Sequence, residues 1–149
     1  MNRPLLKPRL LLIEDDPARI EKFRAWIAGT EFVLIDASSG GRAMGILRPG
    51  MAEGVAGILL DHDLEKQPVT DTDLRLSASN LIDSMIRAVP RHVPVLIHSM
   101  NASQPPVMTK RLVAAGFSVT RRPMSSLTAD LFAAWLDDVR DSWETNASD

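Results

Sequence analysis

The chain has 149 residues, of which 45% are hydrophobic and 24% are charged, and its net charge is −2. There is no cysteine, which excludes disulfides, thiolate metal ligands and cysteine nucleophiles. No basic block or long apolar run indicates a nucleic-acid partner, a membrane span or a signal peptide. We therefore expect a cytoplasmic protein with one domain over residues 1–149, a core between residues 9 and 143, and short disordered termini.

Five short apolar runs rich in Val, Ile and Leu alternate with segments of helical spacing. Nearly continuous apolar character is typical of strands that are covered on both faces of a parallel sheet. The order β-α, repeated five times, predicts a three-layer, doubly wound α/β fold. The predicted strands are 9–14, 31–37, 56–61, 93–99 and 117–122.

Capping residues mark where the helices between these strands begin. The five helices are predicted to begin at Asp16-Pro17, at Ser38 or Ser39, at Ser77 or Ser79, near Met108, and at Ser125 or Ser126. The side chains expected on their inner faces are Ile20, Phe23, Ile27, Met44, Leu47, Leu81, Ile82, Met85, Ile86, Val89, Met108, Leu112, Val113, Leu131, Trp135 and Val139.

Proline and glycine predict the helix ends. The second helix stops at Pro49-Gly50 and the third at Pro90, and Gly116 is the expected C-cap of the fourth. Residues 65–76 form one long polar connection, which makes them a candidate for function or mobility. The tail from residue 143 onward is expected to fray.

Acidic residues fall at the carboxyl ends of the predicted strands, where doubly wound sheets bind ligands. The first strand ends in Glu14-Asp15-Asp16, and the third ends in Asp61, with Asp63 two residues later. Carboxylates this close cannot all ionise unless something compensates their charge. A hard divalent cation such as Mg²⁺ does so, and its open positions can bind a phosphate oxygen. The sequence therefore predicts a metal site with room for a phosphoryl group.

Three further residues lie at the carboxyl ends of the fourth and fifth strands and complete this candidate site. Ser99 offers a hydroxyl and Arg122 a cation beside the phosphoryl group, and His98 could act as a general acid or base. Simpler interpretations stay open: His98 could be a hydrogen-bonded core residue, and residues 14–16 could serve only to cap a helix.

Four motifs in chain order resemble the receiver domain of two-component response regulators over residues 9–140: LLLIEDDP, GILLDHDL, PVLIHS and RRP. The resemblance implies a receiver-like (CheY-like) fold with strand order 2-1-3-4-5 and a phosphoacceptor at Asp61. It implies that Mg²⁺ is contacted by the side chains of Asp15 and Asp61 and by the backbone carbonyl of Asp63. Glu14 would then act through water, and a histidine kinase would be the partner.

The chain also departs from the usual receiver pattern. Arg122 stands where receivers have a lysine. Receivers also have an aromatic residue on the fifth strand, at a position that corresponds to about Val119 in this chain. His98 stands where they have an aliphatic one, and the loop after Asp61 is about ten residues longer. Arginine and lysine are not equivalent at a phosphate site, because arginine offers a planar fork rather than a point charge.

These departures resemble a narrower group, the cyclic-phosphate-processing receiver-like domains, which are proposed to be hydrolytic. The shared strings are LDHDL at residues 60–64 and histidine-serine-x-asparagine at residues 98–101. That group usually has glycine where this chain has Glu65.

The sequence thus predicts a divergent stand-alone receiver-like domain with a pocket for Mg²⁺ or Mn²⁺. It is either a phosphoacceptor in two-component signalling or a metal-dependent cyclic-phosphate phosphoesterase, and a degenerate interaction module is the third hypothesis. The expected partner is a histidine kinase, another signalling protein or a small phosphoester, and a homodimer stays open. The predicted catalytic residues are Asp61, Asp63, His98, Ser99 and Arg122, and the predicted metal ligands are Glu14, Asp15, Asp61 and Asp63.

Overall fold

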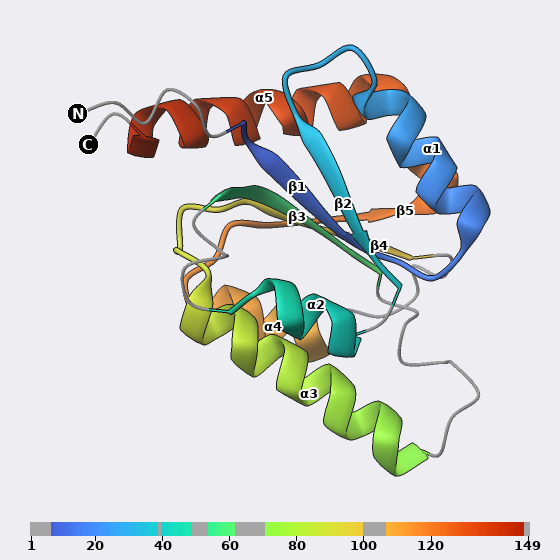
Figure 1. Cartoon of the computed structure of the whole chain (residues 1–149), viewed down its shortest axis with the longest axis vertical. Helices are drawn as coiled ribbons and strands as arrows, with labels where there is room; N and C mark the ends of the chain where they lie inside the picture. Colours follow the sequence, from blue (N-terminus) through green and yellow to red (C-terminus); the bar gives the residue numbers. More distant parts are fainter. Residues whose placement is uncertain (1–6, 39, 49–53, 62–70, 100–106, 148–149) are drawn as a thin grey trace.

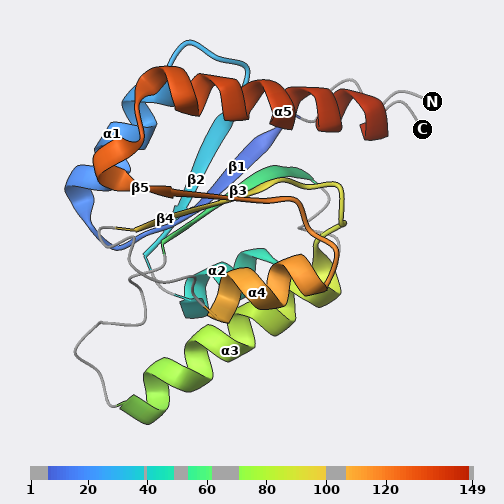
Figure 2. The ribbon, with the colours of Figure 1, turned by 180° about the vertical axis from the view of Figure 1, so that it is seen from behind.

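A computed structural model describes residues 7–38, 40–48, 54–61, 71–99 and 107–147 of the chain. Five parallel strands form one sheet in the order β2-β1-β3-β4-β5, and helices cover both of its faces (Figure 1). Helices α1 and α5 lie on one face, and α2, α3 and α4 lie on the other (Figure 2). The predicted three-layer fold and the strand order 2-1-3-4-5 are confirmed.

The strands follow the apolar runs closely, and three of them begin two residues later than predicted. β4 starts after Pro94, which has no N–H to give to a sheet ladder. Phe117 does not begin β5, because its N–H instead bonds to Leu112 O at 3.1 Å and caps the end of α4. The bounds are β1 Arg9–Ile13, β2 Val33–Ala37, β3 Val55–Asp61, β4 Val95–Ser99 and β5 Val119–Pro123.

Two of the predicted helix caps are confirmed. Asp16 precedes Pro17, and its Oδ1 accepts a hydrogen bond from Ala18 N at 2.9 Å. Gly116 ends α4 with a φ of 103°, a left-handed conformation that favours glycine. The helices are α1 Pro17–Ile27, α2 Gly40–Ile46, α3 Asp71–Ala88, α4 Val107–Ala114 and α5 Ala129–Ala147.

The start of α3 was predicted wrongly. It begins at Asp71 rather than at Ser77 or Ser79, so residues 71–76 are helical and not part of a polar loop. This stretch contains neither glycine nor proline, the two residues that would interrupt a helix. The rest of the predicted loop, residues 65–70, lies outside the described residues.

The last helix also differs from the prediction at both ends. Met124–Ser126 form a short 3₁₀ helix, and α5 begins only at Ala129. Thr128 caps it, since its Oγ1 accepts from Leu131 N at 3.1 Å. The helix continues to Ala147, so residues 143–147 do not fray as expected.

The sheet separates two apolar cores. On the α1/α5 side the core is rich in aromatic rings, and on the side of α2, α3 and α4 it is almost entirely aliphatic. Two predicted inward residues are instead exposed, Val113 at 55% and Leu131 at 38%, because their neighbours Leu112 and Phe132 occupy the buried face. None of the described helices is long and apolar enough to cross a membrane.

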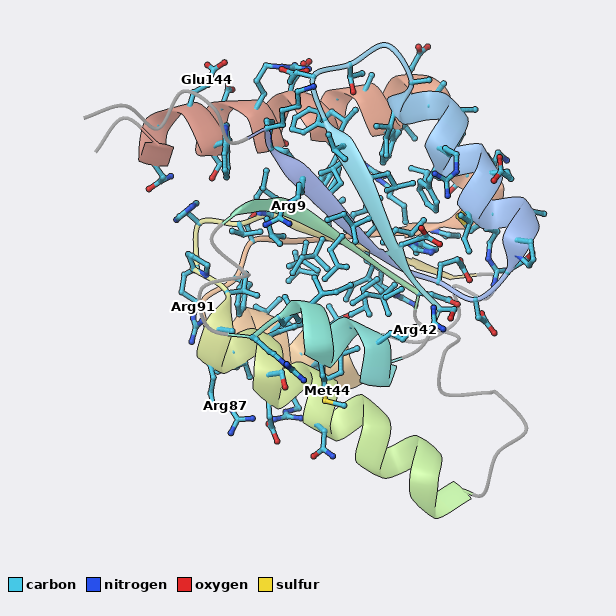
Figure 3. The ribbon with its side chains drawn as sticks, viewed as in Figure 1. Arg9, Arg42, Met44, Arg87, Arg91 and Glu144 are labelled. Carbon is cyan, nitrogen blue, oxygen red and sulfur yellow. The ribbon has the colours of Figure 1, made fainter. Side chains whose placement is uncertain are left out.

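At the amino ends of the strands, Arg91 ties two helix ends together (Figure 3). Its guanidinium donates to Ile86 O at 2.8 Å and Val89 O at 3.1 Å at the end of α3, and to Ala115 O at 2.7 Å after α4. The same group lies over the Phe117 ring at 4.6 Å. A cation bonded to carbonyls at the carboxyl ends of helices is stabilising. Arg91 therefore has a structural role at this end of the sheet, and the candidate site lies at the opposite end.

Candidate functional site

Four neighbouring strands carry one row of ionisable residues at their carboxyl ends. The register sets Asp61 of β3 beside His98 of β4, and His98 beside Arg122 of β5. Glu14 directly follows β1, level with Asp61 in the pairing of β1 with β3. The centroid of the His98 ring lies 4.9 Å from that of the Phe23 ring in α1. Because residues level with one another in neighbouring strands share a face of the sheet, the whole row faces α1 and α5.

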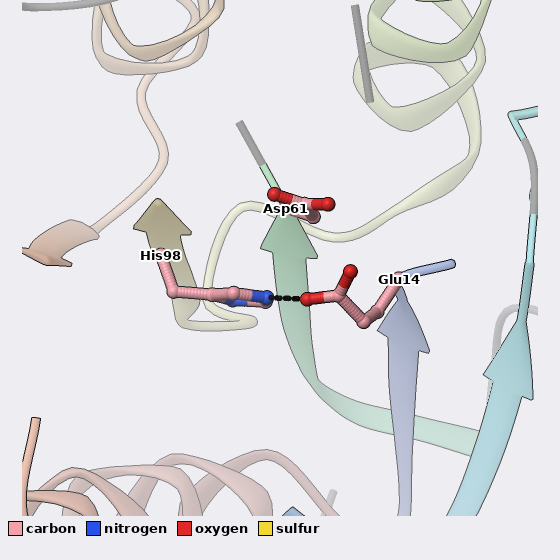
Figure 4. Close-up of side chains that lie close together, drawn as sticks. All are labelled: Glu14, Asp61 and His98. Carbon is pink, nitrogen blue, oxygen red and sulfur yellow. Dashed lines mark hydrogen bonds and ion pairs between the residues drawn. The ribbon is translucent and has the colours of Figure 1, made fainter. Parts of the chain in front are cut away.

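Three members of this row meet in a buried cluster (Figure 4). Glu14, Asp61 and His98 are all 0% exposed, and one ligand atom from each lies within 4.8 Å of the others. Ionised side chains are buried at a high cost in free energy unless they are paired or hydrogen-bonded. The cluster must therefore contain its own compensation or bind a cation.

Glu14 is the centre of the cluster's hydrogen bonds. Its Oε2 accepts from the backbone N–H of Asp15 at 3.0 Å and of Asp16 at 3.1 Å. Arg19 donates through Nε to Oε1 at 2.7 Å and through Nη2 to Oε2 at 3.0 Å. His98 Nε2 lies 2.9 Å from Oε1 (Figure 4). A carboxylate has about four lone-pair sites, so these donors saturate it.

The balance of these contacts keeps Glu14 ionised. Burial by itself raises the pKa of its carboxyl, but the hydrogen bonds from His98 and Arg19 outweigh burial and hold the pKa well below its ordinary value of 4.5. Because an ionised carboxylate only accepts hydrogen bonds, Nε2 of His98 carries a proton and donates it in the hydrogen bond to Glu14. The other ring nitrogen, Nδ1, is buried and has no hydrogen-bond partner among the described residues.

Arg19 is the residue that the sequence reasoning missed. Besides its two bonds to Glu14, its Nη2 lies 3.6 Å from Asp61 Oδ2 and its Nη1 lies 3.4 Å from Asp16 Oδ2. One guanidinium thus compensates three carboxylates, and its own pKa is raised by the hydrogen bond to Glu14. A cation in the first turn of a helix is unfavourable against the helix dipole. In the sequence, the signal for Arg19 was its position shortly after the acidic residues 14–16.

The remaining predicted residues lie around the cluster or outside the described part. Asp15 is exposed, and among the described residues the close group comprises Glu14, Asp61 and His98 without it. The backbone of Ser99 ends β4 opposite Pro123, but its side chain is not described. The predicted site residue Asp63 and Asn101, the last residue of the string at 98–101, also lie outside the described residues.

Arg122 continues the row but is not part of the buried cluster. Its side chain is exposed and lines a cavity of about 130 Å³ between β5 and α5, together with Thr120, Trp135 and Asp138. Within the described part of the chain, no hydrogen bond or ion pair joins the side chain of Arg122 to another residue. It is therefore a cation one strand away from His98, available at the rim of the site.

The donor set fits a small hard cation. Mg²⁺ binds through one or two carboxylates and keeps several waters. Asp61 and Asp15 offer such oxygens at the ends of β3 and β1, whereas the oxygens of Glu14 are already engaged by Arg19, His98 and two backbone N–H groups. The location also fits, because the order 2-1-3-4-5 reverses between β1 and β3, where open α/β sheets bind their ligands.

No protein-family model and no curated protein matches the sequence. Solved structures do match the fold. A signal receiver domain from Vibrio parahaemolyticus is 16% identical with a TM-score of 0.66, and the match covers 97% of this chain and 98% of that one. A CheY-like receiver domain from Methanospirillum hungatei is 14% identical with a TM-score of 0.64, covering 93% of this chain and 98% of that one.

A third match is the receiver domain of a sensor histidine kinase from Pseudomonas aeruginosa, in a structure with a magnesium ion coordinated in the active site cleft. It is 21% identical with a TM-score of 0.59, and the match covers 87% of this chain and 93% of that one. These structural matches establish the fold of the chain. The chain has the fold of response-regulator receiver domains, with a buried Glu14-Asp61-His98 cluster at its candidate site.

Proposed function

We propose that this chain is a receiver domain that accepts a phosphoryl group on Asp61 with the help of Mg²⁺. The observation that carries the proposal is the position of Asp61. It ends the central strand β3, at the point where the strand order reverses, and it is 3.6 Å from a guanidinium. A carboxylate held in this way is a nucleophile with its charge already partly compensated.

Each residue of the cluster has a separate part in this proposal. Asp61 and Asp15 would hold Mg²⁺ through their side chains, Asp63 through its carbonyl, and Glu14 through water, as the receiver resemblance implies. The metal, when bound, supplies positive charge against the phosphoryl oxygens. Glu14 keeps the end of β1 in place through the backbone N–H groups of residues 15 and 16.

The transfer itself needs one nucleophile and two stabilising groups. An oxygen of Asp61 forms the new bond to phosphorus while the bond from phosphorus to the donor breaks, and the electron pair of that bond leaves with the donor. Arg122, at the open rim, replaces the receiver lysine as the cation that contacts the phosphoryl oxygens. Ser99 would donate a hydrogen bond to one of them. A histidine kinase or another signalling protein would be the donor and the partner.

Phosphorylation by acetyl phosphate tests this proposal directly. With Mg²⁺ present, mass spectrometry of the intact protein should show one added phosphoryl group, which is absent from Asp61→Asn. Asp137→Asn is a matched control, because Asp137 is an exposed aspartate of α5, distant in sequence from the cluster, and should be modified like the wild type. An unmodified wild type, or a modified Asp61→Asn, would refute the assignment of Asp61.

One observation favours the phosphoesterase as a second candidate, the contact of His98 with Glu14. A histidine–carboxylate pair can move protons, and an aliphatic residue at this position could not. Against it, the imidazole is fully buried and its Nε2 is engaged by Glu14, so a substrate has no direct access to it. We therefore place phosphoryl acceptance first.

Incubation with 2′,3′- and 3′,5′-cyclic nucleotides, in the presence of Mg²⁺ or Mn²⁺, separates these two candidates. The phosphoacceptor proposal expects no turnover. Hydrolysis that is lost in both His98→Ala and Asp63→Asn would instead establish the phosphoesterase. The interaction-module hypothesis predicts no metal binding at all, so a rise in melting temperature on adding Mg²⁺ would remove it.

A further inference from the structure

Arg19 occupies the place where the proposed metal would be needed most. Its Nη2 lies between an oxygen of Glu14 at 3.0 Å and an oxygen of Asp61 at 3.6 Å. These are the buried acids that follow β1 and end β3, the two strands on either side of the point where the strand order reverses. The guanidinium is therefore a cation, supplied by the chain itself, that already relieves the repulsion between them.

A divalent ion and this guanidinium cannot share the cluster in its present geometry. Two cations a few ångströms apart repel each other, and the repulsion is weakly screened at a buried site. Lysine could give up its proton when it is buried, but arginine stays charged under all ordinary conditions. Arg19 must therefore move when a metal binds next to Asp61.

The structure offers Arg19 a place to go. Its Nη1 is already 3.4 Å from Oδ2 of Asp16, whose side chain is 39% exposed at the open edge of the site. The Arg19 side chain is itself 17% exposed, so part of it already contacts solvent. A rotation of the side chain toward Asp16 would keep one ion pair while it leaves Asp61.

We propose that Arg19 determines the metal affinity of this site, by competing with the divalent ion for Asp61 and Glu14. The inference rests on the proposed metal-dependent function and adds a regulatory residue to it. Arg19 stabilises the metal-free domain through its contacts to Glu14 and Asp61, and it sets the concentration of Mg²⁺ that the site requires. Removing its charge therefore strengthens metal binding, even though it weakens the protein without metal.

The test is a titration with MgCl₂ at constant ionic strength, followed by calorimetry and by the melting temperature. Arg19→Gln should bind Mg²⁺ about tenfold more tightly or better than the wild type, because the competing charge is gone. Its melting temperature should be lower without metal and should rise further when metal is added. Arg24→Gln, on the same helix and paired only at the surface with Glu21 and Asp36, should match the wild type.

A second variant keeps the test decisive if Arg19→Gln does not fold without metal. Arg19→Lys retains the charge but cannot bridge two carboxylates with a planar fork, so its dissociation constant for Mg²⁺ should lie below that of the wild type. Asp61→Asn should abolish binding and so locate the ion.

The outcomes separate this inference from the function on which it rests. If wild type and Arg19 variants bind Mg²⁺ equally, or the variants bind it more weakly, the competition is refuted while the metal site stands. If neither wild type nor variants bind Mg²⁺, the metal-dependent function fails and this inference fails with it.

Discussion

Two pairs of arginine and glutamate in this molecule have the same geometry and different surroundings. Arg19 holds Glu14 through Nε at 2.7 Å and Nη2 at 3.0 Å. Arg140 of α5 holds Glu31 through Nε at 2.5 Å and Nη2 at 2.9 Å. The Glu14 side chain is 0% exposed, whereas that of Glu31 is 44% exposed.

Burial, and not the two-pronged contact, decides what each pair does. A surface pair lies in water of high dielectric constant and is worth about 0–1 kcal/mol. A buried carboxylate that loses its partner is left charged and unsolvated, which makes the pair hard to remove without loss of the fold. Arg140 also contacts a second acid, Asp137, at the surface, but only Arg19 lies beside the buried acids of the candidate site, 3.6 Å from Asp61 Oδ2.

The largest expected effect comes from removing the buried carboxylate. Glu14→Ala should lower the free energy of unfolding by about 3–5 kcal/mol, because Nε2 of the buried His98 and Nε of Arg19 then lose their acceptor. Denaturation with urea at neutral pH measures the change.

Glu31→Ala is the matched control for this measurement and should cost about 1 kcal/mol or less. Equal losses in the two variants would mean that burial does not distinguish the pairs, and the comparison would be wrong.

The second largest effect is expected in the pH dependence of stability, which should differ between the Glu14–Arg19 and Glu31–Arg140 pairs. The pKa of Glu14 is lowered in the folded state, so the unfolded chain binds more protons as the pH falls below the ordinary value of 4.5. The stabilisation is complete above that pH and is lost as the pH falls toward the folded pKa, at up to about 1.4 kcal/mol per pH unit for one group.

Urea denaturation between about pH 6 and pH 3 should therefore show a steeper decline for the wild type than for Glu14→Gln. The pKa of Glu31 is also lowered, by its hydrogen bond to Arg140, so Glu31→Gln should change the slope in the same direction. The change in slope for Glu31→Gln should be smaller than that for Glu14→Gln, because the Glu31–Arg140 pair is exposed to solvent. A wild type and Glu14→Gln with identical slopes would contradict the ionised state of Glu14.

A smaller effect is expected at the cation of the surface pair. Arg140→Gln removes contacts to Glu31 and Asp137 and should destabilise the domain by about 1 kcal/mol or less. The difference from wild type should shrink further in high salt, because exposed charges are screened. A salt-independent difference in melting temperature would show that packing over Phe32, 5.5 Å from the guanidinium, carries the effect instead.

The smallest effect is expected at Arg122, the exposed end of the ionisable row. It has no ion-pair partner in the described ranges, so Arg122→Gln should change the free energy of unfolding by no more than about 0.5 kcal/mol. If Arg122 contacts the phosphoryl group, the same variant should slow labelling by acetyl phosphate at unchanged stability. A large loss of stability would instead show that Arg122 helps to hold the fold together.

Much of the fold could be predicted because local patterns and the sheet agree. The apolar runs before Glu14, Asp61 and His98 are continuous and short, which is typical of strands covered on both faces. Asp16 and Gly116 act within a few residues of themselves, so their roles as caps could be predicted from position alone. The start of α3 could not, because polar residues at a helix end and in a loop look alike.

For the candidate site, the sequence by itself determined which strand ends carry acids, because the alternation of strands and helices predicts a parallel sheet and the resemblance to receivers implies its strand order. Only the tertiary structure decided that Glu14 is saturated and that His98 donates to it. It also decided that the compensating cation is Arg19 of the chain itself. Such contacts depend on side-chain rotamers across strands and helices, over 84 residues between Glu14 and His98, and no local pattern encodes them.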